Sequence, residues 1–414
     1  MTGLSECYNF ADFERAARRR LPRPLFDYIA GGADDEATLR ANIDAFNRYI
    51  LSPRYAVGVG EIDLSAHVLG CDLKWPMLLA PTGMNRMFHP DGELAVAQEA
   101  SRHGIGFTLS TMATSSIEDI AAAVSGPKIF QLYLMADEAM NFETIARCKT
   151  SGYNAICVTI DTIAAGNRER DLRSGLTVPP KLQTSSLVSF LSRPGWCLRY
   201  LSGGSFSLPN VAAGESGDIS TLATFFARKM EKNITWDKIG KLAAHWNGPF
   251  AIKGIQCAED ALKAAEAGAT AVIVSNHGGR QLDGADATIN LVADIVDRVG
   301  GKVEVIADGG FRRGSHIVKA MAMGATACMT GRPYLFGLGA FGRPGVARVL
   351  DLLHEEVGRT MNLIGCRSIA DLDRSFIKRA DIWPEFLKDT GSVNQSDEPD
   401  PKRIKIISDG LTQP

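Results

Sequence analysis

Short apolar runs, each long enough for one buried β-strand, recur along this chain and alternate with helix-like stretches. Eight of them occur, at 77–80, 105–109, 129–132, 155–160, 250–253, 271–274, 303–307 and 327–329. The stretches between them include the Ala-rich segments 258–268 and 313–323, which end at or next to a glycine, as helices often do. This eightfold alternation of strand and helix predicts an α/β fold of the (β/α)8 TIM barrel type.

A doubly wound parallel sheet is the competing architecture. Such a sheet normally carries a G-x-G-x-x-G turn after its first strand, whereas the first run here is followed by Pro81-Thr82-Gly83-Met84. We therefore expect one barrel domain over residues 1–387, with a long insertion at about 174–235 after the fourth strand. The polar, proline-punctuated tail at 388–414 is expected to lie outside the barrel.

The composition is that of a soluble globular protein, with 45% hydrophobic residues, 22% charged residues and a formal net charge of −2. This balance, together with the lack of a basic recognition motif, argues against nucleic-acid binding. The cysteines form no CxxC pair, which favours reduced thiols in the cytoplasm. We expect no secretory signal and no spanning helix, because no apolar stretch is long enough or suitably placed for either.

The middle of the insertion, 181–214, is basic and contains no acidic residue. Lys181, Arg193 and Arg199 carry its charge, and leucines and aromatic residues recur along it. In a barrel, such a segment would lie over the active-site face. It fits a segment that lies in a membrane interface, which would place the protein peripherally on the inner face of the plasma membrane. A lid, an oligomer contact and a disordered loop are the alternatives that the pattern leaves open.

The loop after the sixth apolar run, Ser275-Asn276-His277-Gly278-Gly279-Arg280, follows a β-branched strand directly. The carboxyl ends of barrel strands meet at one pocket, so His277 and Arg280 are expected there. Histidine exchanges a proton near neutral pH, and arginine binds a carboxylate with two parallel hydrogen bonds. Together they predict base chemistry on a substrate that carries a carboxylate. A loop histidine bonded only to backbone is the plainer alternative.

Other polar residues also follow the predicted strands. They are Thr82, Ser110, Gln131, Tyr133, Thr159, Asp161, Arg168 and Lys253. Strands seven and eight are followed by Asp308-Gly309-Gly310-Phe311-Arg312 and Gly331-Arg332, the kind of turn that binds phosphate in barrels. Asp161 and Asp308 lack the neighbouring His or carboxylate ligands that a divalent metal needs. We therefore expect a phosphate-bearing organic cofactor and no metal. Lys253 by itself fits either a Schiff base or a positive charge beside an electron-rich ring.

A series of short motifs carries a family resemblance. They are Tyr28-Ile29-Ala30-Gly31-Gly32-Ala33, Ala80-Pro81-Thr82-Gly83, Phe130-Gln131-Leu132-Tyr133, Lys253-Gly254, the loop from Ser275 to Asp283, Asp308-Gly309-Gly310 and Gly331-Arg332-Pro333. From about Phe10 to Ser368, the chain resembles the FMN-dependent (S)-2-hydroxy-acid oxidising enzymes, which include glycolate oxidase, lactate dehydrogenase and mandelate dehydrogenase.

The resemblance implies a role for each matching residue. The flavin of FMN would be lined by Pro81, Thr82 and Gly83 and hydrogen-bonded by Ser110, Gln131 and Thr159, with Lys253 and Ser275 beside it. The FMN phosphate would be held by Asp308, Gly310, Arg312, Gly331 and Arg332. Arg168 and Arg280 would bind the substrate carboxylate, while Tyr28 and Tyr133 would hydrogen-bond to substrate oxygens. His277 would be the base, and Asp161 would favour its protonated form.

Within the family, Gly83 and the segment 168–172 are most similar to (S)-mandelate dehydrogenase. Met112 and Ala165 stand where glycolate oxidase has other, bulkier residues, which predicts a roomier pocket and an aromatic or long-chain (S)-2-hydroxy acid as substrate. The resemblance also implies a homotetramer and a quinone as electron acceptor. The alternatives are an oxidase that uses O2 and makes hydrogen peroxide, and a Schiff-base lyase acting through Lys253.

Overall fold

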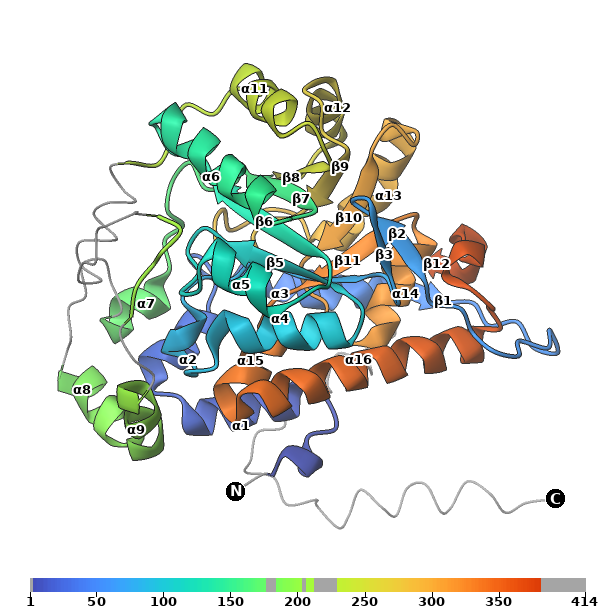
Figure 1. Ribbon diagram of the computed structural model, residues 1–414. Helices are drawn as coiled ribbons and strands as arrows, with labels where there is room; N and C mark the ends of the chain where they lie inside the picture. Colours follow the sequence, from blue (N-terminus) through green and yellow to red (C-terminus); the bar gives the residue numbers. More distant parts are fainter. Residues whose placement is uncertain (1–2, 176–183, 203–205, 212–228, 381–414) are drawn as a thin grey trace, which may run out of the picture.

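Figure 1 shows the computed structural model of the protein, which describes residues 3–175, 184–202, 206–211 and 229–380. Its centre is a closed barrel of parallel strands in the order β10-β11-β4-β5-β6-β7-β8-β9. These strands are β4 Met77–Leu79, β5 Gly106–Ser110, β6 Lys128–Tyr133, β7 Ala155–Thr159, β8 Phe250–Ile255, β9 Ala271–Val274, β10 Glu304–Asp308 and β11 Ala327–Thr330. The predicted TIM barrel is confirmed. The predicted tail at 388–414 lies outside the described residues, so the domain end at 387 stays a prediction.

Each predicted apolar run forms one barrel strand, and the ends differ by only one or two residues. β8 shows the larger difference, because it continues past Lys253 through a break in register to Ile255. Gly254, at this break, has a φ of 106°, and a Cβ there would lie 2.7 Å from the Cβ of Asp161. A glycine is needed at this bulge because the segment after β7 passes directly against it.

The inside of the barrel is apolar toward the amino ends of the strands. Its inward side chains include Leu78, Ile129, Ala155, Cys157, Ala251, Ala271, Ile273, Ile306, Ala327 and Met329. A hairpin of β2 (Ala66–Val68) and β3 (Cys71–Leu73) packs into the same cluster. The backbone N–H of Leu69 donates to Glu304 Oε2 over 2.8 Å at the start of β10. The hairpin therefore closes the amino end of the barrel, and the polar strand-end residues gather at the opposite, carboxyl end.

Helices cover the outside of the barrel (Figure 1). They are α4 Gly92–Arg102, α5 Ile117–Ala123, α6 Glu138–Thr150, α11 Trp236–Trp246, α12 Ala258–Glu266, α13 Thr288–Val299, α14 Gly314–Ala322, α15 Arg332–Phe341 and α16 Arg343–Ile364. α12 and α14 are the two helices expected at 258–268 and 313–323. Gly268 and Gly324 follow them with φ of 91° and 101°, which explains why glycine ends both segments.

Three helices precede the barrel, α1 (Phe10–Arg20), α2 (Arg23–Ala30) and α3 (Ala37–Asp44). Asp283, in the loop after β9, accepts hydrogen bonds from the backbone N–H groups of Ala37 (3.1 Å) and Thr38 (2.7 Å) at the start of α3. Because the first-turn N–H groups of a helix lack partners within the helix, this carboxylate caps α3. The N-terminal segment is thus attached to the loop that carries His277.

The remaining short elements lie outside the barrel. β1 (Tyr49–Leu51) pairs antiparallel with β12 (Ile377–Arg379). The single-turn 3₁₀ helices are η1 Leu4–Glu6, η2 Ala45–Arg48, η3 Asn85–Met87, η4 Ile369–Asp371 and η5 Arg374–Phe376. Of these, η3 follows β4 directly and therefore lies at the carboxyl end of the barrel, next to the candidate site.

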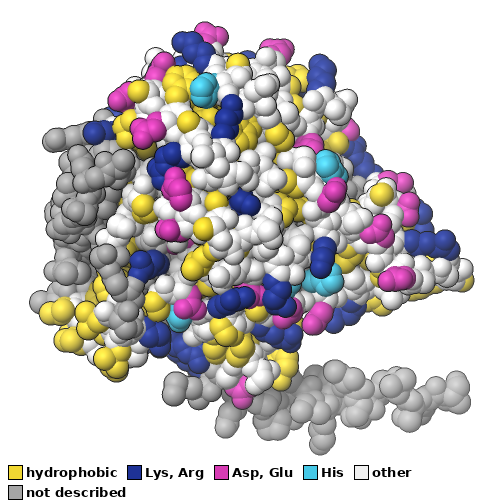
Figure 2. Space-filling model, in the orientation of Figure 1, with side chains coloured by type: hydrophobic (Ala, Val, Ile, Leu, Met, Phe, Trp, Pro, Cys, Tyr) yellow, Lys and Arg dark blue, Asp and Glu magenta, His cyan; other side chains and the backbone are white. Residues whose placement is uncertain are grey.

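The described part of the insertion contains α8 (Thr184–Leu191) and α9 (Pro194–Ser202), and α7 (Glu169–Ser174) ends where the insertion begins. α8 and α9 project from the barrel near α2 (Figure 1), and Figure 2 shows apolar side chains gathered at that corner. The exposed ones are Leu187, Val188, Leu191, Leu198 and Leu201. Lys181 lies outside the described residues. Among the helices in the described ranges, none combines the length and the apolar character that crossing a membrane requires.

Candidate active site

His277 and Asp161 form a hydrogen-bonded pair at the carboxyl end of the barrel. Their Nδ1 and Oδ1 atoms are 2.9 Å apart, and the Asp161 side chain is only 6% exposed. His277 has a φ of 58°, a strained value for a residue with a side chain, and its backbone N–H donates to Ser275 Oγ over 3.1 Å. Burial alone would raise the pKa of Asp161, but the charge and hydrogen bond of His277 outweigh burial and lower it. Since Nδ1 is engaged, Nε2 is the ring nitrogen left to exchange a proton.

Arg168, Arg280 and Tyr28 lie together beside this pair. The guanidinium carbons of Arg280 and Arg168 are 4.9 Å and 5.2 Å from the centroid of the Tyr28 ring. Arg280 Nη1 donates to the carbonyl oxygens of Tyr28 (2.6 Å) and Gly31 (3.0 Å). Burial lowers the pKa of Arg280, and the charge of Arg168 lowers it further. Arg168 Nε also lies 3.2 Å from Asp171 Oδ2, and a carboxylate bound between the two guanidinium groups would further offset their repulsion.

Tyr133 ends β6 close to the same groups. Burial raises the pKa of its phenol, and the carboxylate of Asp161 raises it further. The phenol therefore stays protonated at neutral pH and can donate a hydrogen bond to a substrate oxygen.

Lys253 on β8, Ser275 directly after β9 and Asp308 at the end of β10 form a buried hydrogen-bonded triad. Lys253 Nζ lies 2.9 Å from both Ser275 Oγ and Asp308 Oδ2, and Ser275 Oγ donates to Asp308 Oδ2 over 2.8 Å. Burial alone would lower the pKa of Lys253, but the carboxylates of Asp308 and Asp161 outweigh burial and raise it. Lys253 is therefore a fixed positive charge at neutral pH.

Ser110, Gln131 and Thr159 form a row of buried polar side chains across β5, β6 and β7. Ser110 Oγ donates to Gln131 Oε1 over 3.0 Å, and Gln131 Nε2 donates to Thr159 Oγ1 over 3.0 Å. Each is at most 3% exposed. The row presents fixed donors and acceptors next to Lys253, as a flat polar heterocycle would need.

The segments after β4 and β5 touch at Gly83 and Met112. A Cβ on Gly83 would lie 2.5 Å from the Cβ of Met112, so a side chain at 83 would force the two segments apart. Thr82 Oγ1 lies 2.7 Å from the Tyr334 hydroxyl, which donates to the carbonyl of Ala80 over 2.6 Å. Because Gly83 has no side chain, the two segments can lie in close contact.

The family of FMN-dependent dehydrogenases matches residues 17–379. This chain belongs to that family. It is 41% identical over 381 residues to an L-lactate oxidase of Nostoc sp., covering 91% of this chain and 100% of that protein. It is 38% identical to glycolate oxidase 1 of Oryza sativa subsp. indica, covering 90% of this chain and 96% of the relative. The crystal structure of the monotopic membrane protein (S)-mandelate dehydrogenase superposes with a TM-score of 0.87 at 36% identity, covering 90% and 99% of the two chains.

As an FMN-dependent dehydrogenase, the protein is a flavin oxidoreductase that acts on 2-hydroxy acids. The residues after β10 fit the phosphate of FMN. Arg312 Nε is buried without a hydrogen-bond partner among the described residues, and burial lowers the pKa of Arg312 to about 10. A phosphate would supply the missing acceptor and the missing negative charge. Gly310 keeps this turn compact, since a Cβ there would lie 1.9 Å from the carbonyl oxygen of Asn42.

Arg332 has partners that sequence reasoning did not anticipate. Its guanidinium donates to the carbonyl oxygens of Ile29 (2.9 Å), Gly31 (2.9 Å) and Gly278 (3.0 Å). In these contacts it joins the end of α2 to the loop that carries His277. Gly331, which precedes it, packs beside Thr82, with ordinary spacing even for an added Cβ. The roles of Arg332 and Gly331 as phosphate ligands stay predictions.

The arrangement of the residues expected beside the flavin ring of this FMN-dependent dehydrogenase also fits a flavin. Gln131 and Lys253 are on strands separated only by β7 and offer an amide and an ammonium from the same end of the barrel. Pro81 is partly buried at the end of β4, whereas Ala165 is exposed in the segment after β7. Within the described ranges, no group of three His, Cys, Asp or Glu side chains is placed to hold a metal ion.

Two positioning residues of this FMN-dependent dehydrogenase were missed by sequence reasoning. Gln281 Nε2 donates to the carbonyls of Asp161 (2.9 Å) and Ala164 (2.8 Å), which attaches the segment after β7 to the loop of His277. Glu93, fully buried on α4, accepts from the backbone N–H groups of Asn85 (2.9 Å) and Thr114 (3.0 Å). Gln281 lies within the quoted motif, but a motif does not show which backbone groups a side chain reaches.

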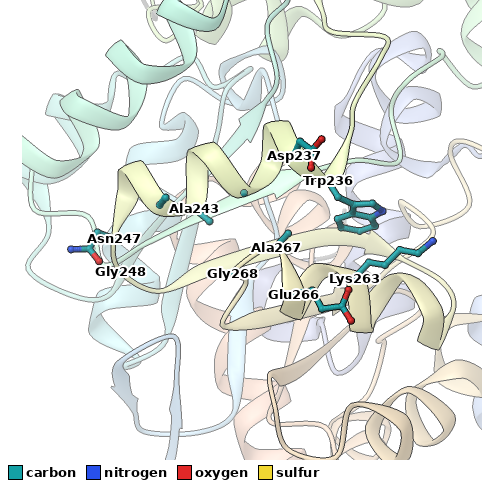
Figure 3. A pocket seen from close by; sticks show the side chains of 11 residues that line it. Trp236, Asp237, Ala243, Asn247, Gly248, Lys263, Glu266, Ala267 and Gly268 are labelled. Carbon is teal, nitrogen blue, oxygen red and sulfur yellow. The ribbon is translucent and has the colours of Figure 1, made fainter.

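Figure 3 shows a separate groove between α11 and α12. Its lining includes Trp236, Ala243, Lys263 and Gly268. These residues belong to α11 and α12 and to the turns that lead from these helices into the amino ends of β8 and β9. The groove is therefore remote in the fold from the carboxyl ends of the strands, and none of the candidate active-site residues lines it.

Proposed function

We propose that this protein oxidises an (S)-2-hydroxy acid with an aromatic or other large side chain to the 2-oxo acid, with His277 as the base. The observation that carries the proposal is the His277–Asp161 pair, 2.9 Å apart, beside Arg168 and Arg280, two partly buried guanidinium groups that repel each other. A proton acceptor next to a carboxylate site is the combination that oxidation of a 2-hydroxy acid requires.

The proposed roles follow from the contacts of each residue. Arg168 and Arg280 bind the substrate carboxylate and orient the substrate, with Tyr28 and Tyr133 as neighbouring hydrogen-bond donors. His277 takes a proton at Nε2, from either the α-carbon or the hydroxyl group, and Asp161 stabilises the imidazolium that results. FMN, which Gln131, Lys253 and Arg312 would hold, would accept the two electrons together with the second proton.

A large substrate side chain is supported by the residues around the expected pocket. Met112 is flexible and only partly buried, and Ala165 is small and exposed at the outer edge, whereas the space beside Gly83 is already filled by Met112. Met112 and Ala165 leave room where bulkier residues would exclude an aromatic ring.

A membrane quinone is the electron acceptor that we propose. Its support is the α8–α9 surface, where the exposed leucines named above lie on the same two-helix unit as Arg193 and Arg199. Apolar side chains with nearby cations favour an interface that carries anionic lipids. The similarity to a relative described as a monotopic membrane protein points the same way. The second candidate is an oxidase that uses O2, which the 41% identity to an L-lactate oxidase supports.

The lyase alternative is not favoured. A Schiff-base lysine must lose its proton to become a nucleophile, whereas Asp308 raises the pKa of Lys253 and keeps the amine charged.

The test is anaerobic mixing of the purified yellow protein with (S)-mandelate, (S)-lactate and glycolate, followed by flavin absorbance. We expect reduction to be fastest with mandelate, and reoxidation to be faster with a quinone than with air. His277→Ala should keep FMN and lose several orders of magnitude in the rate of reduction. A protein that no 2-hydroxy acid reduces contradicts the proposal, and rapid reoxidation by air supports the oxidase. Sedimentation with anionic lipid vesicles tests the membrane surface, and light scattering tests the proposed homotetramer.

A further inference from the structure

The α8 helix of the insertion caps a helix of the active site. α2 begins at Arg23 after Pro22, and no side chain of its own N-cap residue accepts a hydrogen bond from its first turn. The backbone N–H of Arg23 instead donates to Ser189 Oγ on α8, over 2.8 Å and 166 positions along the chain. Ser189 therefore provides an acceptor for one of the first-turn N–H groups, which have no partner within the helix.

The α9 helix makes a second contact, with the turn that follows Gly83. Trp196 Nε1 donates to the carbonyl oxygen of Met87, at the end of η3, over 3.0 Å. Phe88, the next residue, is 1% exposed and stacks on the ring of Tyr28, with centroids 6.2 Å apart and planes 29° apart. A buried carbonyl that lost this donor would either find another partner or shift the turn.

Both contacts lead to the same side chain. Tyr28 lies on α2, which Ser189 caps, and its ring rests on Phe88, next to the carbonyl that Trp196 binds. Tyr28 also lies within 5.2 Å of the guanidinium carbons of Arg168 and Arg280, measured from the centroid of its ring. α2 has only eight residues, so its position depends on tertiary contacts more than on its own hydrogen bonds.

We infer that Ser189 and Trp196 are positioning residues for Tyr28, so that the α8–α9 unit is part of the substrate-carboxylate site as well as a surface feature. The inference rests on the proposed function, because it needs Tyr28, Arg168 and Arg280 to bind the substrate carboxylate. Loosening either contact lets Tyr28 move relative to the two arginines. This weakens substrate binding and leaves the His277–Asp161 pair in place.

The experiment compares Ser189→Ala and Trp196→Phe with the wild-type holoenzyme, using the concentration dependence of anaerobic flavin reduction by (S)-mandelate. Trp196→Phe keeps an aromatic ring and removes only the donor. We expect each variant to raise the substrate Kd about 3- to 10-fold, the usual effect of one hydrogen bond, while the limiting rate of reduction falls less than twofold. Ser189→Thr, which keeps the hydroxyl group, should restore most of the affinity of Ser189→Ala.

Two matched variants serve as controls. Trp236→Phe makes the same change in the α11–α12 groove of Figure 3, and Ser192→Ala removes a hydroxyl, directly after α8, that donates to the carbonyl of Ser189. Both should leave the Kd unchanged. FMN content and the melting temperature of every variant report whether it folds.

Combination with Tyr28→Phe separates positioning from general damage. If Trp196 acts through the Tyr28 hydroxyl, Trp196→Phe should add little to the Kd of Tyr28→Phe. Additive effects, unchanged Kd values in folded variants, or a fall in the limiting rate without a change in Kd would each overturn the inference. A wild-type protein that no 2-hydroxy acid reduces would instead overturn the proposed function, so the two failures are distinguishable.

Discussion

Replacing Asp161 with asparagine tests the proposed base directly. Asparagine has nearly the same shape, so its amide oxygen can still accept the hydrogen bond from His277 Nδ1. The negative charge is lost, however, and with it the stabilisation of the imidazolium that forms when His277 takes a proton. The side chain is only 6% exposed and lies 2.9 Å from the imidazole, so solvent cannot replace that charge effectively.

The size of the effect follows from this geometry. A hydrogen bond to a charged group contributes about 1.5–3 kcal/mol net and a neutral one about 0.5–1.5 kcal/mol, so losing the charge while keeping the bond costs about 1–1.5 kcal/mol. Each 1.36 kcal/mol of transition-state stabilisation is a factor of ten in rate. Asp161→Asn should therefore slow flavin reduction by about 5- to 13-fold. The substrate Kd should change by less than about threefold, because Arg168 and Arg280 keep their contacts.

Anaerobic stopped-flow mixing with (S)-mandelate measures both quantities. The matched control is Asp72→Asn, which removes the carboxylate of a second His–Asp pair, with His67, at 2.8 Å on the exposed β2–β3 hairpin. That variant should behave as wild type. A wild-type rate in Asp161→Asn, or a loss confined to Kd, would refute the assignment of His277 as a base stabilised by Asp161.

Three further outcomes are expected. Lys253→Met should leave Asp308 buried without its cation and lower the free energy of unfolding of the apoprotein, measured in urea, by about 3–5 kcal/mol. The control, Lys263→Met, removes an exposed ion pair with Asp260 on α12 and should lower that free energy by under about 1 kcal/mol. Gln281→Leu should lower kcat/KM about 10-fold with FMN still bound, because the segments carrying Asp161 and His277 lose their joint hydrogen bonds; unchanged kinetics would show that other contacts suffice. Burial lowers the pKa of Lys319 to about 8, so the unfolded chain binds more protons than the folded one between that value and about 10.4. Stability in urea should thus rise with pH through this window, and Lys319→Met should remove that rise.

The barrel could be predicted from the sequence because its information is local. Each strand is a short apolar run and each helix an amphipathic or Ala-rich segment between turns, and a barrel only repeats that unit. The bulge that extends β8 to Ile255 was not predictable, because Gly254 is required by a residue of another strand end, Asp161.

The candidate site was predictable to the same degree. Strand order places His277, Asp161, Lys253 and Gln131 at one end of the barrel whatever the details of packing, since the carboxyl ends of parallel strands converge. The partners of Arg332 were not predictable, because they are carbonyl groups of α2 and of the His277 loop.

The repeating architecture and the chemical groups at the strand ends could be predicted from residue types and their short-range order alone. The side chains that hold those groups in place could be identified only in the folded protein. Ser189, Trp196 and Gln281 act on backbone atoms that lie far away in the chain, and a backbone N–H or C=O has the same identity at nearly every position. A contact with such a group leaves no mark in the sequence and exists only once the chain has folded.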